Sequence, residues 1–212
     1  MNIAEQLAKI AENEPKVFDA GKKAQYDEFW DSIQEKGESY VSYQYSFGGG
    51  RWNNTTFQPK YDLKGKSFFR CFAESAITTI EKTIDLTRVT GSTSMQNMFN
   101  NAIIVTINNF VVGENTTFHN TAFNGCTELV TLNMTGTIAK NNLDLSTCTK
   151  LSATSVLSIL NACNKENAGV TITLPSKCID KKTVTETYIA NNTDLATALA
   201  NADANGYTIS FR

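Results

Sequence analysis

Hydrophobic and polar residues alternate in a recurring order through the middle of this 212-residue chain. Four similar segments read CFAESAITTI at 71–80, MFNNAIIVTI at 98–107, AFNGCTELVTL at 122–132 and DLSTCTKLSAT at 144–154. Each begins with an apolar residue, continues with four or five small or polar residues, and then has an aliphatic residue. The apolar starts are Phe72, Phe99, Phe123 and Leu145, and the aliphatic positions are Ile77, Ile104, Leu129 and Leu151. The first three copies have a second aliphatic residue at Ile80, Ile107 and Leu132.

The starts of the four copies are 27, 24 and 22 residues apart. A period in the twenties is typical of stacked supersecondary units, each too small to bury its own apolar face. We therefore predict an α+β (mixed) fold built on a short β solenoid, with an N-terminal helical segment and a β/α C-terminal cap. Such proteins mostly present surfaces, which favours binding over catalysis.

Further elements follow from local patterns. Within the repeats we expect strands at 78–84, 103–107, 111–112 and 129–134. Ser152 is a good N-cap, and ATSVLSILNAC after it has the apolar spacing of a helix. We expect a strand at 170–175, a helix at 194–202 capped by Asn192 or Thr193, and a last strand at 207–211.

The N-terminal segment is predicted to be helical over 2–36. Ile3, Leu7 and Ile10 have 4–3 spacing, so that Ile3 and Ile10 are one heptad apart. We expect these residues either to contact copies of the chain in a homo-oligomer or to dock the helix on its own domain.

Aromatic residues dominate the segment before the first copy. SYVSYQYSF at 39–47 alternates aromatic and polar residues, which predicts a half-buried strand. Trp52, Phe57 and Tyr61 follow the GGG turn at 48–50. They are interpreted either as a sugar-stacking platform or as a cap over the open end of the stack.

Four regions result from this pattern. They are an N-terminal helical segment for attachment or oligomerisation at 1–37, a cap or connection at 38–70, the repeats at 71–151, and a C-terminal strand–helix–strand cap at 152–212.

Charge and targeting signals narrow the classes of partner. The formal net charge is −2 and no basic stripe occurs, so neither nucleic acid nor anionic membrane is an expected partner. No run approaches the roughly 18–20 apolar residues that span a bilayer. The N-terminus lacks the apolar core of a signal peptide, which predicts cytoplasmic synthesis.

The five cysteines are an odd number without a CxxC pair, so we expect no zinc site and no disulfide framework. Cys126 and Cys148 occupy the same repeat position. A buried thiol filling each layer is the simplest interpretation. A disulfide between the two is the alternative.

The third copy resembles a known family. FNGCTELVTLNM is similar to the BspA-type leucine-rich repeat, whose units commonly run Phe–x–x–Cys–Thr–x–Leu–x–x–Leu. The full match consists of Phe123, Cys126, Thr127, Leu129 and Leu132. Cys148, Thr149 and Leu151 match in part, with Leu145 replacing the Phe, while the copies at Phe72 and Phe99 lack the Cys–Thr pair. The resemblance implies a leucine-rich-repeat-like solenoid.

A second resemblance concerns the segment KVFDAGKKAQYDEFWDSIQEKG followed by FQPKYDL. It is similar to the leader of tail or minor structural proteins from prophages of gut Firmicutes, where a helical N-terminus precedes such repeats. This implies a phage or prophage tail-associated protein and a possible virion location.

No catalytic chemistry emerges from the motifs. His119 is the only histidine and lies in an Asn/Thr-rich turn, and GxSxG, P-loop, GxGxxG and HExxH motifs do not occur. We expect no enzyme activity, cofactor or metal. The predicted function is a structural or adhesion protein that presents its solenoid surface to a protein or glycan partner. The alternatives are a carbohydrate-binding module or weak glycosidase using aromatic residues near Trp52, and an intracellular repeat scaffold.

Overall fold

The computed structural model describes residues 28, 42–44, 46–48, 61–166, 168–179 and 182–212. The chain divides into two units, residues 1–40 and 41–212. In the first unit the described residue is Glu28, which is helical and exposed. The predicted oligomer contacts Ile3, Leu7 and Ile10 lie outside the described residues.

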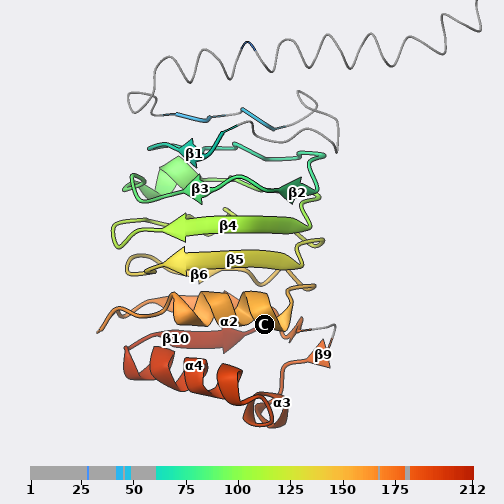
Figure 1. Cartoon of the computed structure of the whole chain (residues 1–212), viewed down its shortest axis with the longest axis vertical. Coiled ribbons are helices and arrows are strands. Elements are labelled where there is room, and N and C mark those ends of the chain that lie inside the picture. The colour runs from blue at the N-terminus through green and yellow to red at the C-terminus, as the bar shows by residue number, and fades with distance from the viewer. Residues whose placement is uncertain (1–27, 29–41, 45, 49–60, 167, 180–181) are drawn as a thin grey trace, which may run out of the picture. The chain divides into compact units, whose positions relative to one another are not determined.

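Parallel strands form the main sheet of the second unit (Figure 1). They are β1 (Leu63–Lys64), β2 (Thr79–Ile80), β3 (Ile84–Asp85), β4 (Thr106–Val112) and β5 (Thr131–Gly136). The central strand is β4, which pairs with β2 and β3 on one side and with β5 on the other. The remaining strand, β1, pairs with β3.

A second parallel sheet has the strand order β10–β7–β6. Its strands are β6 (Leu143–Asp144), β7 (Thr171–Leu174) and β10 (Thr208–Phe211). Helix α2 (Ala153–Asn161) lies between β6 and β7 in the sequence, and α4 (Thr193–Ala204) lies between β7 and β10. Two parallel strands joined through a helix make a β-α-β unit. Shorter elements are η2 (Ser92–Met95), β8 (Lys177–Cys178), β9 (Lys182–Thr183) and α3 (Glu186–Ala190).

The fold class is therefore α/β with parallel sheets and few helices, and the predicted α+β (mixed) class is wrong. The predicted leucine-rich-repeat-like β solenoid is not supported. No closed solenoid is found in the described part of the chain. The apolar period indicates that strands lie side by side. It does not indicate that they divide between two sheets, or that α2 and α4 alternate with β7 and β10.

Several local predictions are confirmed. Helix α2 begins directly after Ser152, whose hydroxyl accepts a hydrogen bond from the N–H of Ser155. Helix α4 is capped by Asn192, one of the two expected residues. Strands β7 and β10 lie within the predicted ranges 170–175 and 207–211.

Strand boundaries inside the repeats differ from the prediction because the strands bulge outward. The predicted strand 78–84 is two strands, β2 and β3, and the predicted strands 103–107 and 111–112 are one, β4. Three residues separate the paired positions Ile80 and Ile84, while two separate Ile107 and Phe110. In β5 a single residue lies between the paired positions Leu132 and Met134. The run of residues between the paired positions is the bulge of each layer, where a layer is one repeat of the stack. This bulge thus shortens by one residue from each layer to the next.

A column of phenylalanine rings runs through the core. Phe47, Phe72, Phe99 and Phe123 stack in this order, with ring centroids 4.9, 5.2 and 5.1 Å apart. All four rings are buried. Phe110 from β4 packs against two of them, with its centroid 6.3 Å from that of Phe99 and 5.8 Å from that of Phe123. Such pairs contribute about 0.5–1.5 kcal/mol each beyond the burial of area.

The column starts one layer earlier than the sequence indicates, at Phe47. Its ring stacks on Phe72, and its N–H donates to the carbonyl of Cys71 (2.7 Å). The preceding buried aromatic, Tyr43, stacks on Phe68 in the same way. Among the described residues of 39–47 no strand forms, and Ser42 makes only an isolated bridge to Ser67. The repeat pattern does not identify Phe47 as the start of a copy, because GGG follows it where the other copies have polar residues and an aliphatic pair.

One turn follows the apolar start of every copy. The N–H groups of Ser75, Ala102, Cys126 and Cys148 donate to the carbonyls of Phe72, Phe99, Phe123 and Leu145 (3.1, 2.9, 3.1 and 2.8 Å). In the first three turns the residue before the donor has a positive φ, at Glu74 (57°), Asn101 (53°) and Gly125 (76°). Asn and Gly tolerate this left-handed conformation best, which explains FNNA and FNGC in the sequence.

We expect Phe99→Ala to lower the free energy of unfolding by about 3–5 kcal/mol, because it removes a ring held between two others. Phe99→Leu, which places at this position the residue found at Leu145, should cost clearly less. Urea unfolding followed by circular dichroism measures both. A loss below about 1 kcal/mol for Phe99→Ala would show that the column contributes little.

Gly136 ends β5 with φ +93°, and a Cβ there would collide with the carbonyl oxygen of Val112. Gly169 also has a positive φ (+62°), but a Cβ there would have nothing within 4 Å. We expect Gly169→Ala to cost about 1 kcal/mol, from backbone strain alone. Gly136→Ala should cost about 3 kcal/mol because the strand must also move. Equal losses of unfolding free energy for the two variants, measured by thermal unfolding, would show that a Cβ at Gly136 meets no obstacle.

Candidate functional site

The outer face of the main sheet carries a row of threonines. Thr79 pairs with Thr106, and Thr106 pairs with Thr131, so that adjacent strands each contribute one hydroxyl at the same level. All three are half-buried, while the next residues, Ile80, Ile107 and Leu132, are buried on the inner face. Neighbouring strands lie about 4.8 Å apart, which fixes the spacing of the hydroxyls.

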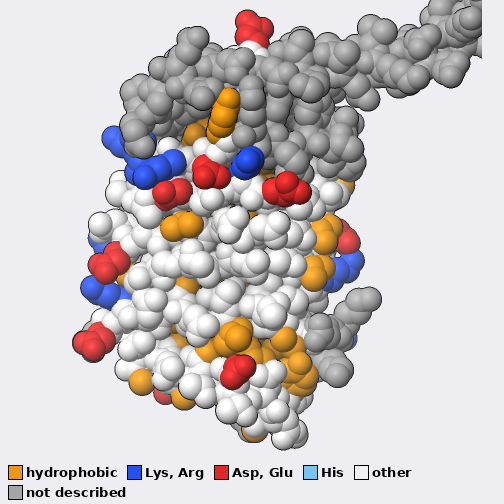
Figure 2. Space-filling view, in the orientation of Figure 1, with side chains coloured by type: hydrophobic (Ala, Val, Ile, Leu, Met, Phe, Trp, Pro, Cys, Tyr) orange, Lys and Arg blue, Asp and Glu red, His pale blue; other side chains and the backbone are white. Residues whose placement is uncertain are grey.

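Further neutral polar side chains flank this row. Asn109 in β4 and Asn133 and Thr135 in β5 are exposed. The side-chain amide of Asn109 donates to the carbonyl of Glu81 in the preceding layer (3.3 Å), so this amide is held against the bulge. In Figure 2 the surface over β4 and β5 is mostly neutral, whereas charged side chains gather toward β1 and β3. The face therefore presents hydroxyl and amide groups, with a cluster of charged side chains toward β1 and β3.

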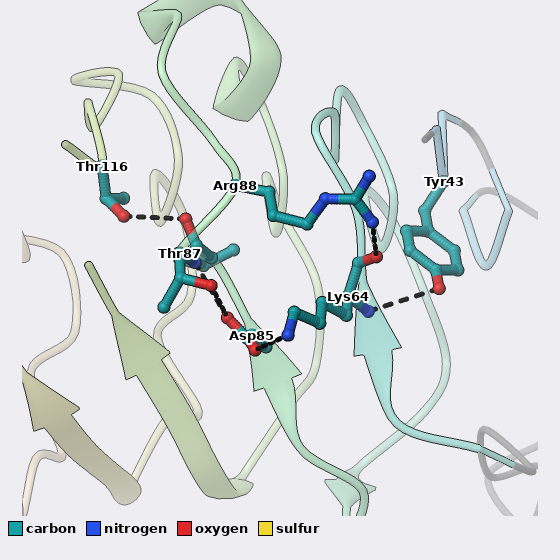
Figure 3. A network of polar contacts seen from close by, with 7 residues as sticks. Tyr43, Lys64, Asp85, Thr87, Arg88 and Thr116 are labelled. Atoms are coloured by element: carbon teal, nitrogen blue, oxygen red, sulfur yellow. Dashed lines mark hydrogen bonds and ion pairs between the residues drawn. The ribbon is translucent and has the colours of Figure 1, made fainter. Parts of the chain in front are cut away.

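The charged end is ordered by a polar network (Figure 3). Lys64 Nζ lies 3.6 Å from Asp85 Oδ2, and Asp85 Oδ1 accepts from the hydroxyl and the N–H of Thr87 (2.6 and 2.9 Å). The guanidinium of Arg88 donates to the carbonyl of Lys64 (3.5 Å), and the N–H of Lys64 donates to the Tyr43 hydroxyl (3.3 Å). Because the Lys64 side chain is half exposed, its ion pair contributes at most about 1 kcal/mol. The network mainly fixes where the charges lie.

The turn at Asp85 is a signal that the sequence analysis missed. Asp85 and Asp144 each end a short strand, and each carboxylate accepts from a backbone N–H two residues on, that of Thr87 or Ser146 (both 2.9 Å). The two sites read Asp-Leu-Thr and Asp-Leu-Ser. This is an Asx turn, which ends a strand by offering the chain a local acceptor.

The residues named from the repeats lie in the core. All are buried: Phe72, Ile77, Phe99, Ile104, Phe123, Cys126, Leu129, Leu132, Leu145, Cys148 and Leu151. Of the proposed aromatic platform, Tyr61 is half-buried. Trp52 and Phe57 lie outside the described residues, so the platform stays a prediction.

The five cysteines are free and buried. The thiol of Cys126 donates to the carbonyl of Phe99 (3.0 Å), one layer back, and that of Cys148 approaches the carbonyl of Phe123 (3.9 Å). Burial raises the pKa of Cys126 and of Cys163 to about 12 and that of Cys178 to about 11. Because Cys126 and Cys148 are both free, the disulfide alternative is not found in this structure. The thiols resist ionisation, which is the reverse of what a nucleophile needs.

His119 belongs to a local turn. Its Nδ1 accepts from the N–H of Thr121 (3.2 Å) and lies 2.8 Å from the Thr121 hydroxyl. Within the described residues no group of three or more His, Cys, Asp or Glu side chains is placed to hold a metal ion.

The described part of the chain contains a small polar pocket and a larger groove. A pocket of about 310 Å³ is lined by Gln44, Ser67, Phe69, Thr93 and Ser94. A larger, mainly apolar groove of about 550 Å³ lies at α3, α4 and β10.

Comparison with known proteins reveals no relative: no family model, no curated protein and no solved structure matches the chain. The resemblances to BspA-type repeats and to phage tail proteins therefore stay predictions. Over the described residues, no helix has both the length and the apolar character needed to cross a membrane.

The raised thiol pKa values predict a loss of stability in alkali. A thiol whose pKa is higher in the folded than in the unfolded chain favours folding fully below the unfolded pKa, and this contribution disappears as pH rises toward the folded pKa. We expect the free energy of unfolding to fall from pH 9 upward, by at most about 1.4 kcal/mol per pH unit for each such thiol.

Cys126→Ala is the matched control, because Ala102 already occupies this turn position in the preceding copy. The free energy of unfolding of this variant, measured by urea unfolding with reductant present, should fall less steeply between pH 9 and 11 than that of the native sequence. Identical slopes would show that the Cys126 thiol ionises as readily when folded.

Proposed function

We propose that this chain is a non-enzymatic binding or structural protein that presents the outer face of its main sheet to a protein or glycan partner. The observation that carries the proposal is the row Thr79, Thr106 and Thr131, in register across neighbouring strands and flanked by exposed Asn133 and Thr135.

Rigid support makes this row suitable for binding. Two of the threonines are followed by fully buried residues, Ile107 and Leu132. The strands that carry them pack on the phenylalanine column behind the sheet. Side chains held in this way lose little conformational freedom when a partner arrives, which favours affinity. Hydroxyl and amide groups donate and accept hydrogen bonds, which matches a sugar or an exposed peptide backbone.

Tail association is the second part of the proposal. The resemblance of residues 16–37 to the leader of prophage tail proteins supports it, with attachment or oligomerisation assigned to the N-terminal segment around Ile3, Leu7 and Ile10. Detection of the chain by mass spectrometry in particles purified after prophage induction tests this setting separately.

Binding of the fluorescently labelled chain to cells of gut Firmicutes tests the binding face. We expect the native sequence to label cells, and Asn133→Lys to reduce labelling about tenfold or more, because a long charged side chain blocks the face. Asn120→Lys is the matched control: Asn120 is exposed in a turn away from the strands, so labelling should persist.

Pretreatment of the cells separates the two kinds of partner. Periodate oxidation should abolish labelling if the partner is a glycan, and protease digestion should abolish it if the partner is a protein. Labelling that is absent for the native sequence, or equal for Asn133→Lys and Asn120→Lys, would refute the binding face.

A further inference from the structure

Strand β10 has an open side. It lies at the end of its sheet and pairs only with β7 among the described residues. The N–H groups of Thr208 and Arg212 donate to the carbonyls of Val170 and Leu174 (both 2.9 Å). Alternate residues of a strand in a parallel ladder bond to the same neighbour. The backbone groups of Ile209 and Phe211 therefore face the open side.

The edge of β5, unlike that of β10, has hydrogen-bond partners in place of a further strand. Helix α2 lies against that edge, and the hydroxyls of Ser155 and Ser158 accept from the N–H groups of Leu132 and Met134 (2.9 and 3.1 Å). The same hydroxyls donate to the carbonyls of Val130 and Leu132 (3.0 and 2.9 Å). Two serines thus replace a missing strand at β5. In the part of the chain that the structure describes, no side chain does the same for β10.

An apolar groove adjoins the open strand. Leu199 and Ala200 of α4 line it together with Ile209, and Asp203 is the charged residue in its wall. Ile209 and Phe211 are only half-buried, although both lie on the inner face of the sheet beside the buried residues of β7. Figure 2 shows hydrophobic side chains gathered over α4 and β10.

We propose that a second copy of this chain covers the open side, with the two β10 strands pairing antiparallel about a two-fold axis at Ser210. In this register Ile209 of one copy lies opposite Phe211 of the other, and each such pair exchanges both backbone hydrogen bonds. The outward-facing groups are then all satisfied, and the two three-stranded sheets become one. Strand β10 contains no charge or proline, the features by which edges usually resist pairing.

Charge complementarity favours a second copy as the occupant. Asp203 lies near the beginning of β10 and Arg212 directly follows its end, and neither side chain has a hydrogen bond or ion pair within the described residues. Antiparallel pairing brings Arg212 of each copy to the Asp203 end of the other, whereas parallel pairing would bring like charges together. Asp194 does not oppose this arrangement, because nine residues at 100° each place it on the opposite side of α4.

Sedimentation velocity of the full-length chain over a wide range of concentration tests the proposal. We expect the native sequence to associate, and Arg212→Glu or Asp203→Arg alone to weaken association about tenfold. The double variant Asp203→Arg/Arg212→Glu should restore it, because the opposite charges then meet again with their signs exchanged.

Asp194→Arg is the matched control on the same helix and should leave association unchanged, with circular dichroism confirming that every variant is folded. A native chain that stays monomeric at all concentrations would overturn the proposal. Association that persists in both single variants would also overturn the proposal, because the contact must then use another surface. A double variant that fails to associate would overturn it as well. This dimer is independent of the binding face proposed above.

Discussion

The contact between one phenylalanine layer and the next determines the position of everything else in the described unit. The N–H groups of Phe47, Phe72 and Phe99 donate to the carbonyls of Cys71, Met98 and Ala122, each of which immediately precedes the next ring (2.7, 2.7 and 2.8 Å). Ring stacking and this backbone bond act on the same residue. Each layer is therefore placed by its neighbour, both laterally and in register.

The polar surface follows from this packing. Successive strand residues point to opposite sides, so a shift of one residue would exchange Thr106 with Ile107. The buried rings resist that exchange, because it would expose Ile107 and bury a hydroxyl without a partner. The alignment of the polar side chains on the outer face is thus a consequence of the packing of the buried side chains on the inner face. Threonines need no contacts with one another to stay aligned.

Much of the core could be predicted from the sequence, because burial and turns are local properties. Phe99 and Ile104 are buried as expected, and the cap at Ser152 starts α2. The division into two sheets could not be predicted, because it depends on which distant segments pair. Phe47 was missed because glycines follow it. The roles of Ser155 and Ser158 at the β5 edge were missed because a serine on a helix has no sequence signal for a strand.

The shortening bulge gives the sheet a direction. The layer of Ile80 and Ile84 has three residues between its paired positions, that of Ile107 and Phe110 has two, and that of Leu132 and Met134 has one. Bulges bend a strand and increase its local twist, so each layer departs from the flat ladder to a different degree. A molecule lying across the strands would meet a graded series of spacings instead of a uniform lattice. Rotating that molecule end over end would reverse the order in which it meets the three bulges, so its two orientations on this face are not equivalent.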